Sequence, residues 1–309
     1  MAGDVGKTGT PLQLGDGSVT GGDTAALGFT GPATVFSPIT VGTASFGNSY
    51  KLNVAANTSV SFAQPITLNQ SLTVSTVATT GTNATNISWG ISAAAFGTTL
   101  TFDNAGLVNV GPTTGISDGS GSISVVKSNS GILVFAAPNT YTGGTTINGG
   151  AIVFNAPNTI GGTGANVTVN QGAVAVVGTG FNYTNLNGTF FNRVDPNSQG
   201  AVALLADSSE NFDFSFAGLN FPFVSFGGAG TNVTYTGTIT PANGTYRLYG
   251  AVGNFNLPKV NAITGSNALI VDGALNGAVV LGASNDFNGG STINTGGTLA
   301  VNDGTGLGS

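Results

Sequence analysis

The sequence contains no cysteine and no histidine among its 309 residues. Without cysteine the chain forms no disulfide and offers no thiolate to a metal ion. Without histidine it lacks the side chain most often used as a general base. Enzyme classes that depend on a thiol nucleophile or an imidazole base are therefore excluded, and a catalyst of this composition would have to work with carboxylates, hydroxyls, Arg or Lys.

Charged side chains are also scarce. Only 6% of the residues are charged, against roughly 25% in typical globular proteins. The net charge is −6, and the six basic residues are spread thinly along the chain. No basic patch is present to neutralise phosphates or anionic lipid, so we expect no nucleic-acid partner. No apolar run approaches the roughly 20 residues of a membrane span, so we expect no direct membrane insertion by this segment.

Helix-forming residues are few, since Glu occurs once and Lys and Arg are rare, while Gly occurs 51 times. Short runs with strand character recur instead, and most are bounded by Gly, Asn, Asp or Pro. Clear examples are Ser71–Ser75, Asn166–Asn170 and Thr298–Val301. This pattern predicts an all-β protein, built as a sandwich, a closed sheet or a solenoid of short strands.

An internal repeat favours the solenoid. Residues 131–153 align without a gap to residues 277–299, at the offset of 146 that separates Asn139 from Asn285. The copies share an Asn, an aromatic residue and a Gly-Gly pair, which we expect at the corners of a repeating unit. These corner residues are Asn139, Tyr141, Gly143, Gly144, Asn285, Phe287, Gly289 and Gly290.

The repeat has the layout of a coil. The segment Gly131–Phe135 predicts a strand, residues 139–144 a turn, and Thr145–Ile147 and Ala151–Phe154 further strands. One such coil cannot bury its own inward face, so neighbouring coils must cover it, stacked at about 4.8 Å. We expect one parallel β-helical solenoid over residues 1–309, with a dozen or so coils of roughly 20 residues each. The Phe-rich residues 181–226 are expected to form a loop or an insertion.

The segment Asn139–Asn148 resembles the autotransporter-associated β-strand repeat, and Ile116–Lys127 resembles the lead-in of that family. The closing Asn302–Ser309 resembles its usual tail. The resemblance lies within the repeat-like units 116–162 and 262–309. In the repeat-like unit 262–309, Asp286 and Asn288 replace the Thr residues that flank the aromatic residue in the other copy. The resemblance implies a right-handed parallel β-helix in the passenger region of a large exported bacterial surface protein.

Acidic residues are mostly isolated. Several precede Gly, as at Asp16, Asp118, Asp272 and Asp303, a pattern typical of turns. One region concentrates charge and could hold calcium or a sugar, although a solvated loop is the favoured interpretation. Its members are Arg193, Asp195, Asp207, Glu210 and Asp213.

Three phenylalanines, Phe212, Phe214 and Phe216, alternate along a candidate strand. If exposed, they would form a surface on which a sugar or another partner could stack. Alternating Phe more often fills a core, which is the favoured interpretation. Together with Arg193, Asp207, Glu210 and Asp213 they make up the candidate ligand surface for a glycan or a host or matrix surface.

These observations predict a rigid stalk or adhesin segment without catalysis, cofactor or metal. We expect it outside the cell or at the cell surface, associated with an outer membrane through regions absent from this chain, and therefore a fragment of a longer polypeptide. A carbohydrate-binding or carbohydrate-active β-helix is the first alternative, and it requires carboxylates on one outer face. A phage fibre module is the second.

Overall fold

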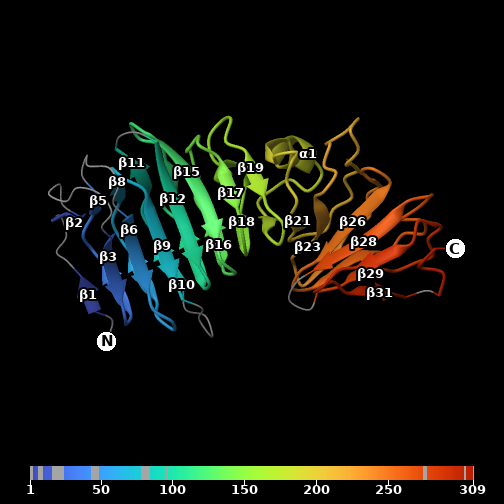
Figure 1. Ribbon diagram of the computed structural model, residues 1–309, viewed down its shortest axis with the longest axis horizontal. Coiled ribbons are helices and arrows are strands. Elements are labelled where there is room, and N and C mark those ends of the chain that lie inside the picture. Colours follow the sequence, from blue (N-terminus) through green and yellow to red (C-terminus); the bar gives the residue numbers. More distant parts are fainter. Residues whose placement is uncertain are drawn as a thin grey trace. The chain divides into compact units, whose positions relative to one another are not determined.

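The computed structural model describes residues 3–5, 10–15, 24–42, 49–77, 84–94, 97–273, 277–302 and 304–308. The chain is nearly all β, and its parallel strands form a right-handed β-helical solenoid of about 11 turns, as predicted (Figure 1). By its internal contacts it divides into two compact units, Met1–Thr168 and Val169–Ser309. Each unit is described by itself.

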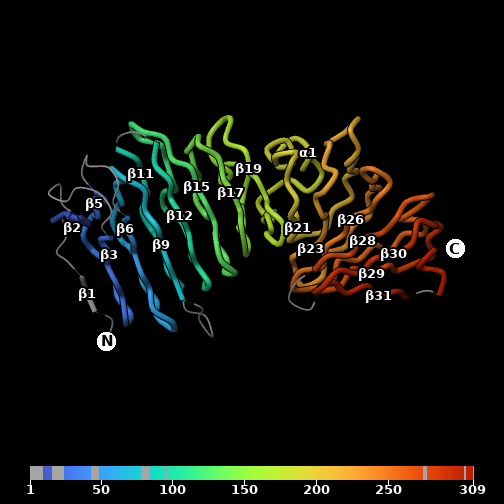
Figure 2. The backbone as a smooth tube through the Cα atoms, viewed as in Figure 1, coloured from blue at the N-terminus to red at the C-terminus, as the bar shows by residue number. Residues whose placement is uncertain are grey.

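In the first unit, successive coils contribute strands to three parallel ladders, which Figure 2 lets the reader follow along the backbone. The first ladder contains β1 (Gly3–Val5), β4 (Ala33–Val35), β7 (Val60–Phe62), β10 (Ala84–Ile87), β13 (Leu107–Val110), β16 (Ile132–Phe135) and β18 (Ala151–Phe154). The second contains β2 (Leu12–Leu14), β5 (Ile39–Val41), β8 (Ile66–Leu68), β11 (Ile91–Ala93) and β14 (Ile116–Ser117). The third contains β3 (Thr24–Phe29), β6 (Ser49–Val54), β9 (Leu72–Thr76), β12 (Gly97–Asn104), β15 (Ser122–Ser128), β17 (Thr145–Ile147) and β19 (Val167–Val169), and the unit boundary falls within β19.

The core of this unit follows from strict alternation along the strands. In β12 every second side chain is buried, and Leu100 and Phe102 are fully enclosed. Leu100 pairs in register with Leu72 of one neighbouring coil and Val125 of the other. Because side chains alternate between faces, register pairing stacks inward residues on inward residues. The apolar rows therefore continue from coil to coil.

The second unit has two main ladders and a short pair of strands. One ladder contains β20 (Val174–Val177), β21 (Ala201–Leu204), β23 (Ser225–Gly228), β26 (Thr245–Gly250), β28 (Ala268–Gly273) and β30 (Ser291–Ile293). The other contains β24 (Asn232–Thr234), β27 (Asn254–Leu257), β29 (Val279–Leu281) and β31 (Leu299–Val301), and β22 (Phe212–Asp213) pairs with β25 (Ile239–Thr240). The Phe-rich residues 181–226 contain β21, β22 and the start of β23, with loops between these strands.

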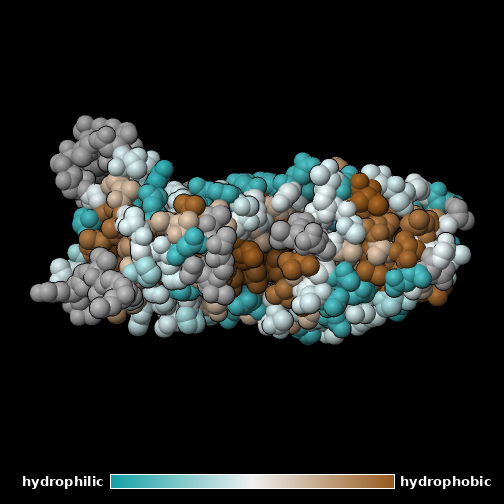
Figure 3. All heavy atoms as spheres, turned by 90° about the horizontal axis from the view of Figure 1, so that it is seen from below, coloured by the Kyte–Doolittle hydropathy of each residue, from teal (hydrophilic) through white to brown (hydrophobic). Residues whose placement is uncertain are grey.

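Within the described ranges, helical structure is limited to single turns. These are the 3₁₀ turns η1 (Pro157–Thr159) and η2 (Phe191–Arg193) and the short helix α1 (Leu186–Thr189). No helix in the described ranges is long and apolar enough to cross a membrane. Figure 3 shows one face of the molecule, where hydrophobic residues gather in patches surrounded by polar and near-neutral ones.

Candidate functional site

Asparagine forms the corner of the first repeat. Asn139 is only 4% exposed. Its Oδ1 accepts a hydrogen bond from the Ile116 amide at 2.7 Å, and its Nδ2 donates to the Thr159 carbonyl at 2.6 Å. Ile116 belongs to the preceding coil and Thr159 to the following one. A single buried side chain therefore joins three coils.

The second repeat has the same arrangement at Asn285, which is also buried. Its Oδ1 accepts from the Ile263 amide at 2.9 Å, and its Nδ2 donates to the Gly306 carbonyl at 3.2 Å. The same side chain thus binds backbone about one coil behind it and one coil ahead of it in both copies.

The aromatic residue of each copy is buried beneath its corner. Tyr141 and Phe287 are 0% and 1% exposed. The Tyr141 hydroxyl lies 2.6 Å from the Thr145 hydroxyl and donates to the Ile160 carbonyl at 3.0 Å. Phe287 has no hydroxyl, and an exposed serine, Ser291, occupies the position of Thr145. The apolar ring is therefore common to both corners, whereas the hydroxyl contacts belong to the first.

The two glycines of each corner are needed for different reasons. Gly144 and Gly290 have φ of +81° and +80°, a left-handed conformation that other residues adopt at a cost. Gly143 donates its amide to the Ile123 carbonyl at 3.0 Å, and a Cβ there would overlap with that carbonyl. Gly289 likewise lies against backbone of the preceding coil. The Gly-Gly pair thus supplies one left-handed residue and one close backbone approach.

A lysine occupies an inward position in an apolar row. Lys127 pairs in register with Phe102 and Ile147 and is fully buried. Its ammonium group donates to corner carbonyls, those of Ser128 at 2.6 Å, Asn129 at 2.8 Å, Gly149 at 3.3 Å and Asn104 at 3.4 Å. Burial lowers the pKa of Lys127 to about 8, while the charge of Asp103 acts in the opposite direction. Lys127 therefore serves as a hydrogen-bond donor to backbone carbonyls. Because its side chain is not exposed to solvent, it is also inaccessible to a substrate.

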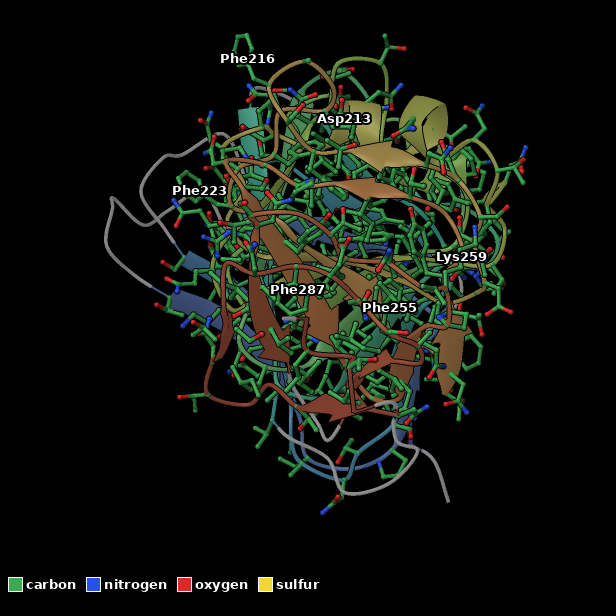
Figure 4. The ribbon with its side chains drawn as sticks, turned by 90° about the vertical axis from the view of Figure 1, so that its right-hand side faces the viewer. Asp213, Phe216, Phe223, Phe255, Lys259 and Phe287 are labelled. Carbon is green, nitrogen blue, oxygen red and sulfur yellow. The ribbon has the colours of Figure 1, made fainter. Side chains whose placement is uncertain are left out.

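The structure corrects the surface role considered for Phe212 and Phe214, because both are buried, at 1% and 6% exposure. The Phe212 ring lies 4.9 Å from that of Phe191 and 5.0 Å from that of Phe226, within an aromatic cluster. Their alternation fills a core, as the favoured interpretation held. Phe216 is 88% exposed, and Figure 4 shows it projecting away from the coils.

The five charged residues near this cluster do not converge on one point. Each carboxylate binds backbone amides in its own surroundings: Glu210 those of Leu186 and Asn187, Asp207 that of Thr234, Asp213 that of Ser215, and Asp195 that of Asn197. Arg193 lies in η2. Among the described residues, no group of three or more acidic side chains is placed to hold a metal ion. The carboxylates therefore accept hydrogen bonds from backbone amides close to them in space, and Glu210 caps the first turn of α1 in this way.

A groove in the second unit was not anticipated. It has a volume of about 480 Å³ and lies on the outer side of the ladder from β20 to β30. Its polar and aromatic lining includes Gln171, Gln199, Phe223, Arg247, Asp272 and Asn294.

Asp272 forms the centre of this groove. Its Oδ2 accepts from the Ser225 hydroxyl at 2.6 Å, and its Oδ1 accepts from Asn294 Nδ2 at 2.6 Å. Burial raises the pKa of Tyr249 in the adjacent strand, and the charge of Asp272 raises it further. Asp272 lies within β28, so its assignment to a turn was wrong. Asp118, by contrast, does lie in a turn, where it accepts from the Ile123 amide at 2.8 Å.

Arg247 lies in β26 of the neighbouring coil, two residues before Tyr249, the register partner of Asp272. Its Nε donates to the Pro222 carbonyl at 3.2 Å, and its guanidinium carbon is 5.9 Å from the ring centroid of Phe223. Phe223 is half exposed, and Figure 4 shows it at the outer margin of the coils. A cation and an exposed aromatic ring thus line the groove next to a carboxylate.

The first unit has a groove of about 500 Å³ beside the half-exposed Trp89, lined also by Pro65, Thr114 and Ser117. Charged side chains are absent from the described lining. This groove therefore offers less to a polar ligand than the one around Asp272.

The residues of the Asp272 groove lie far apart in sequence, which is why inspection of local runs missed them. Ser225 is 47 residues from Asp272, and Asn294 is 22 residues from it. The signal that could have found them is a polar residue at the outward position of successive strands, one coil apart. Asp16 and Asp303, the other two turn assignments, lie outside the described residues.

Two stretches of the chain, residues 125–154 and 276–301, match the family model of the passenger-associated-transport-repeat. They contain both asparagine corners, both aromatic residues and Lys127. Neither the curated proteins nor the solved structures include one that matches the chain. The two repeats and the parallel solenoid that carries them fit an autotransporter passenger β-helix repeat protein.

Proposed function

We propose that the chain is a non-catalytic structural segment of an exported passenger and acts as a rigid stalk at the bacterial cell surface. The observation that carries this proposal is the asparagine corner. In both repeats a buried Asn binds backbone of the coils before and after it, so that neighbouring coils are held in one register.

The physics of the stack favours a mechanical role. Parallel strands pair from coil to coil, so backbone hydrogen bonds run along the stacking direction in each unit. Few ionic contacts contribute to the stability of the stack, because only 6% of the residues are charged. Dissolved salt therefore has few charge interactions to screen. Such a segment keeps its length under changing ionic conditions.

The chemistry of the described residues supports a non-catalytic role. Hydrolysis of a glycosidic bond ordinarily needs two carboxylates on either side of the bond. Asp272 is the one acidic residue in the described lining of its groove. Lys127 has a lowered pKa but is fully buried.

The match to the passenger-associated-transport-repeat supports export to the cell surface. We place the chain outside the cell, held at the outer membrane by regions of the parent protein beyond this segment. The match to a passenger repeat favours this assignment over a phage fibre module.

Stretching single molecules of the chain between optical traps tests the mechanical role. A rigid stalk keeps its length as the force rises and then unfolds in abrupt steps, because coils in one register open together. The Asn139→Ala variant should begin to unfold at lower force. Smooth lengthening from the lowest forces, as a flexible linker shows, would contradict the proposal.

A further inference from the structure

The groove around Asp272 spans several coils. Its lining extends from Gln171, just before β20, through β21, β23, β26 and β28, to Asn294, just after β30. Residues of six successive coils line the groove, and at a spacing of about 4.8 Å the five steps between them give a length of roughly 24 Å. The groove therefore fits an extended chain molecule better than a small compact ligand.

The polar side chains of the groove offer both hydrogen-bond donors and hydrogen-bond acceptors. Arg247 contributes only donors, Asp272 only acceptors, and the amides of Gln171, Gln199 and Asn294 contribute both. The opposite charges of Arg247 and Asp272 offset each other, and the chain as a whole carries a net charge of −6. A polyanion would be repelled, whereas a neutral molecule rich in hydroxyl groups can use donors and acceptors alike.

Two of these side chains retain unused hydrogen-bonding capacity. In the described structure Arg247 forms one hydrogen bond, from Nε, out of the five that a guanidinium group can donate. Asp272 accepts two hydrogen bonds, and a carboxylate has about four acceptor positions. The half-exposed ring of Phe223 adds an apolar surface on which the C–H face of a sugar can pack.

We propose that this groove binds a neutral polysaccharide chain laid across the coils. Arg247 donates to sugar oxygens, Asp272 accepts from sugar hydroxyls, and Phe223 packs against a pyranose ring. The amides of Gln171 and Asn294 contact the ligand toward the two ends of the groove. This binding site adds an adhesive function to the stalk and does not depend on the stalk being rigid.

Titration calorimetry with the purified full chain tests the proposal. The probes are the neutral polysaccharides dextran, mannan, xylan and soluble β-glucan, beside the anionic pectate and hyaluronate. We expect at least one neutral polysaccharide to bind, with an affinity that changes little as salt is raised, because no net charge is neutralised. Pectate and hyaluronate should bind more weakly.

Three variants locate the site. The Arg247→Ala variant should lose about tenfold or more in affinity, because hydrogen bonds to charged groups are the stronger ones. The Gln171→Ala variant should lose affinity as well, and because Gln171 is exposed the substitution leaves the core untouched. The control is Lys259→Ala, which removes the same charge from an exposed position that Figure 4 shows on the side away from Phe223. It should bind as the unaltered chain does.

Several results would overturn the proposal. These are binding of none of the neutral probes by the folded chain, stronger binding of the anionic probes, and equal affinities for the Arg247→Ala, Gln171→Ala and Lys259→Ala variants. Unfolding followed by far-UV circular dichroism shows whether each variant is folded. If Arg247→Ala is unfolded, Gln171→Ala alone decides the outcome.

Discussion

Replacing Asn139 by alanine removes one side chain and two cross-coil hydrogen bonds. The Ile116 amide loses its acceptor and the Thr159 carbonyl loses the Nδ2 donor. Both residues are buried, at 0% and 1% exposure. A buried polar group left without a partner costs about 1–3 kcal/mol, so the free energy of unfolding should fall by about 2–6 kcal/mol. Whole domains are stable by only about 5–15 kcal/mol, so such a loss is large.

The matched control is Asn158→Ala. Asn158 lies in the next coil and is exposed, and its backbone carbonyl accepts from the Asn139 amide at 2.8 Å. Removal of its side chain leaves that bond in place, and we expect a change within about 0.5 kcal/mol. The pair of variants therefore separates loss of the corner from loss of any asparagine.

Denaturant unfolding followed by far-UV circular dichroism gives the difference in the free energy of unfolding between the variants. Hydrogen exchange of individual amides reports the loss of protection at the corner itself. The Ile116 amide should exchange roughly ten- to a hundredfold faster in Asn139→Ala, because its buried acceptor is gone. An Asn139→Asp variant keeps the Oδ1 acceptor but turns an oxygen toward the Thr159 carbonyl, so it should gain stability relative to the unaltered chain as low pH protonates the carboxyl group. Equal unfolding midpoints for Asn139→Ala and Asn158→Ala, with the Ile116 amide equally protected in both, would show that the Asn139 side chain does not hold the coils together.

Three further predictions concern the corners and the aromatic cluster. The pKa of Lys127 is lowered from 10.5 to about 8, so above pH 8 the unfolded chain binds more protons at this group than the folded chain does. Stability should therefore rise from pH 8 to about pH 9.5, below tyrosine ionisation, and unfolding midpoints of Lys127→Met should lack that rise. Gly290→Ala should lower the free energy of unfolding by about 1–2 kcal/mol because of its left-handed φ alone. Gly289→Ala should lower it further, because the added Cβ overlaps with backbone atoms of the preceding coil. Equal losses of stability in thermal unfolding would contradict this difference. Phe191→Ala should cost about 3–5 kcal/mol, whereas the exposed Phe216→Ala should change stability by less than about 0.5 kcal/mol, as chemical denaturation can show.

Much of the fold could be predicted from local pattern. The segment Ala151–Phe154 is a strand with the predicted bounds, and Gly131–Phe135 differs from β16 by one residue. The repeat at an offset of 146 placed the corners, because Gly-Gly and a buried aromatic are requirements of the turn itself. Gly144 and Gly290 adopt nearly the same φ in the two copies.

Other features could not be predicted, because they depend on where the chain turns and on which coils become neighbours. Phe216 continues the alternation of Phe212 and Phe214 in sequence, but β22 ends at Asp213. The Asp213 carboxylate accepts from the Ser215 amide at 2.9 Å, which begins a turn and directs the next ring outward. Asp272 precedes Gly273 as a turn residue would, yet it lies in a strand.

Disulfide cross-linking can show directly whether neighbouring coils stack in one parallel register. The chain has no cysteine, so two introduced thiols are unique. Thr101 and Val126 are register partners with outward side chains on neighbouring coils, at a spacing of about 4.8 Å that allows a disulfide. Thr99 and Val126 lie two residues out of register, roughly 8 Å apart, which is too far. We expect mild oxidation to close a disulfide in Thr101→Cys/Val126→Cys and to leave the two thiols of Thr99→Cys/Val126→Cys unpaired. Closure of the second pair in place of the first would contradict it.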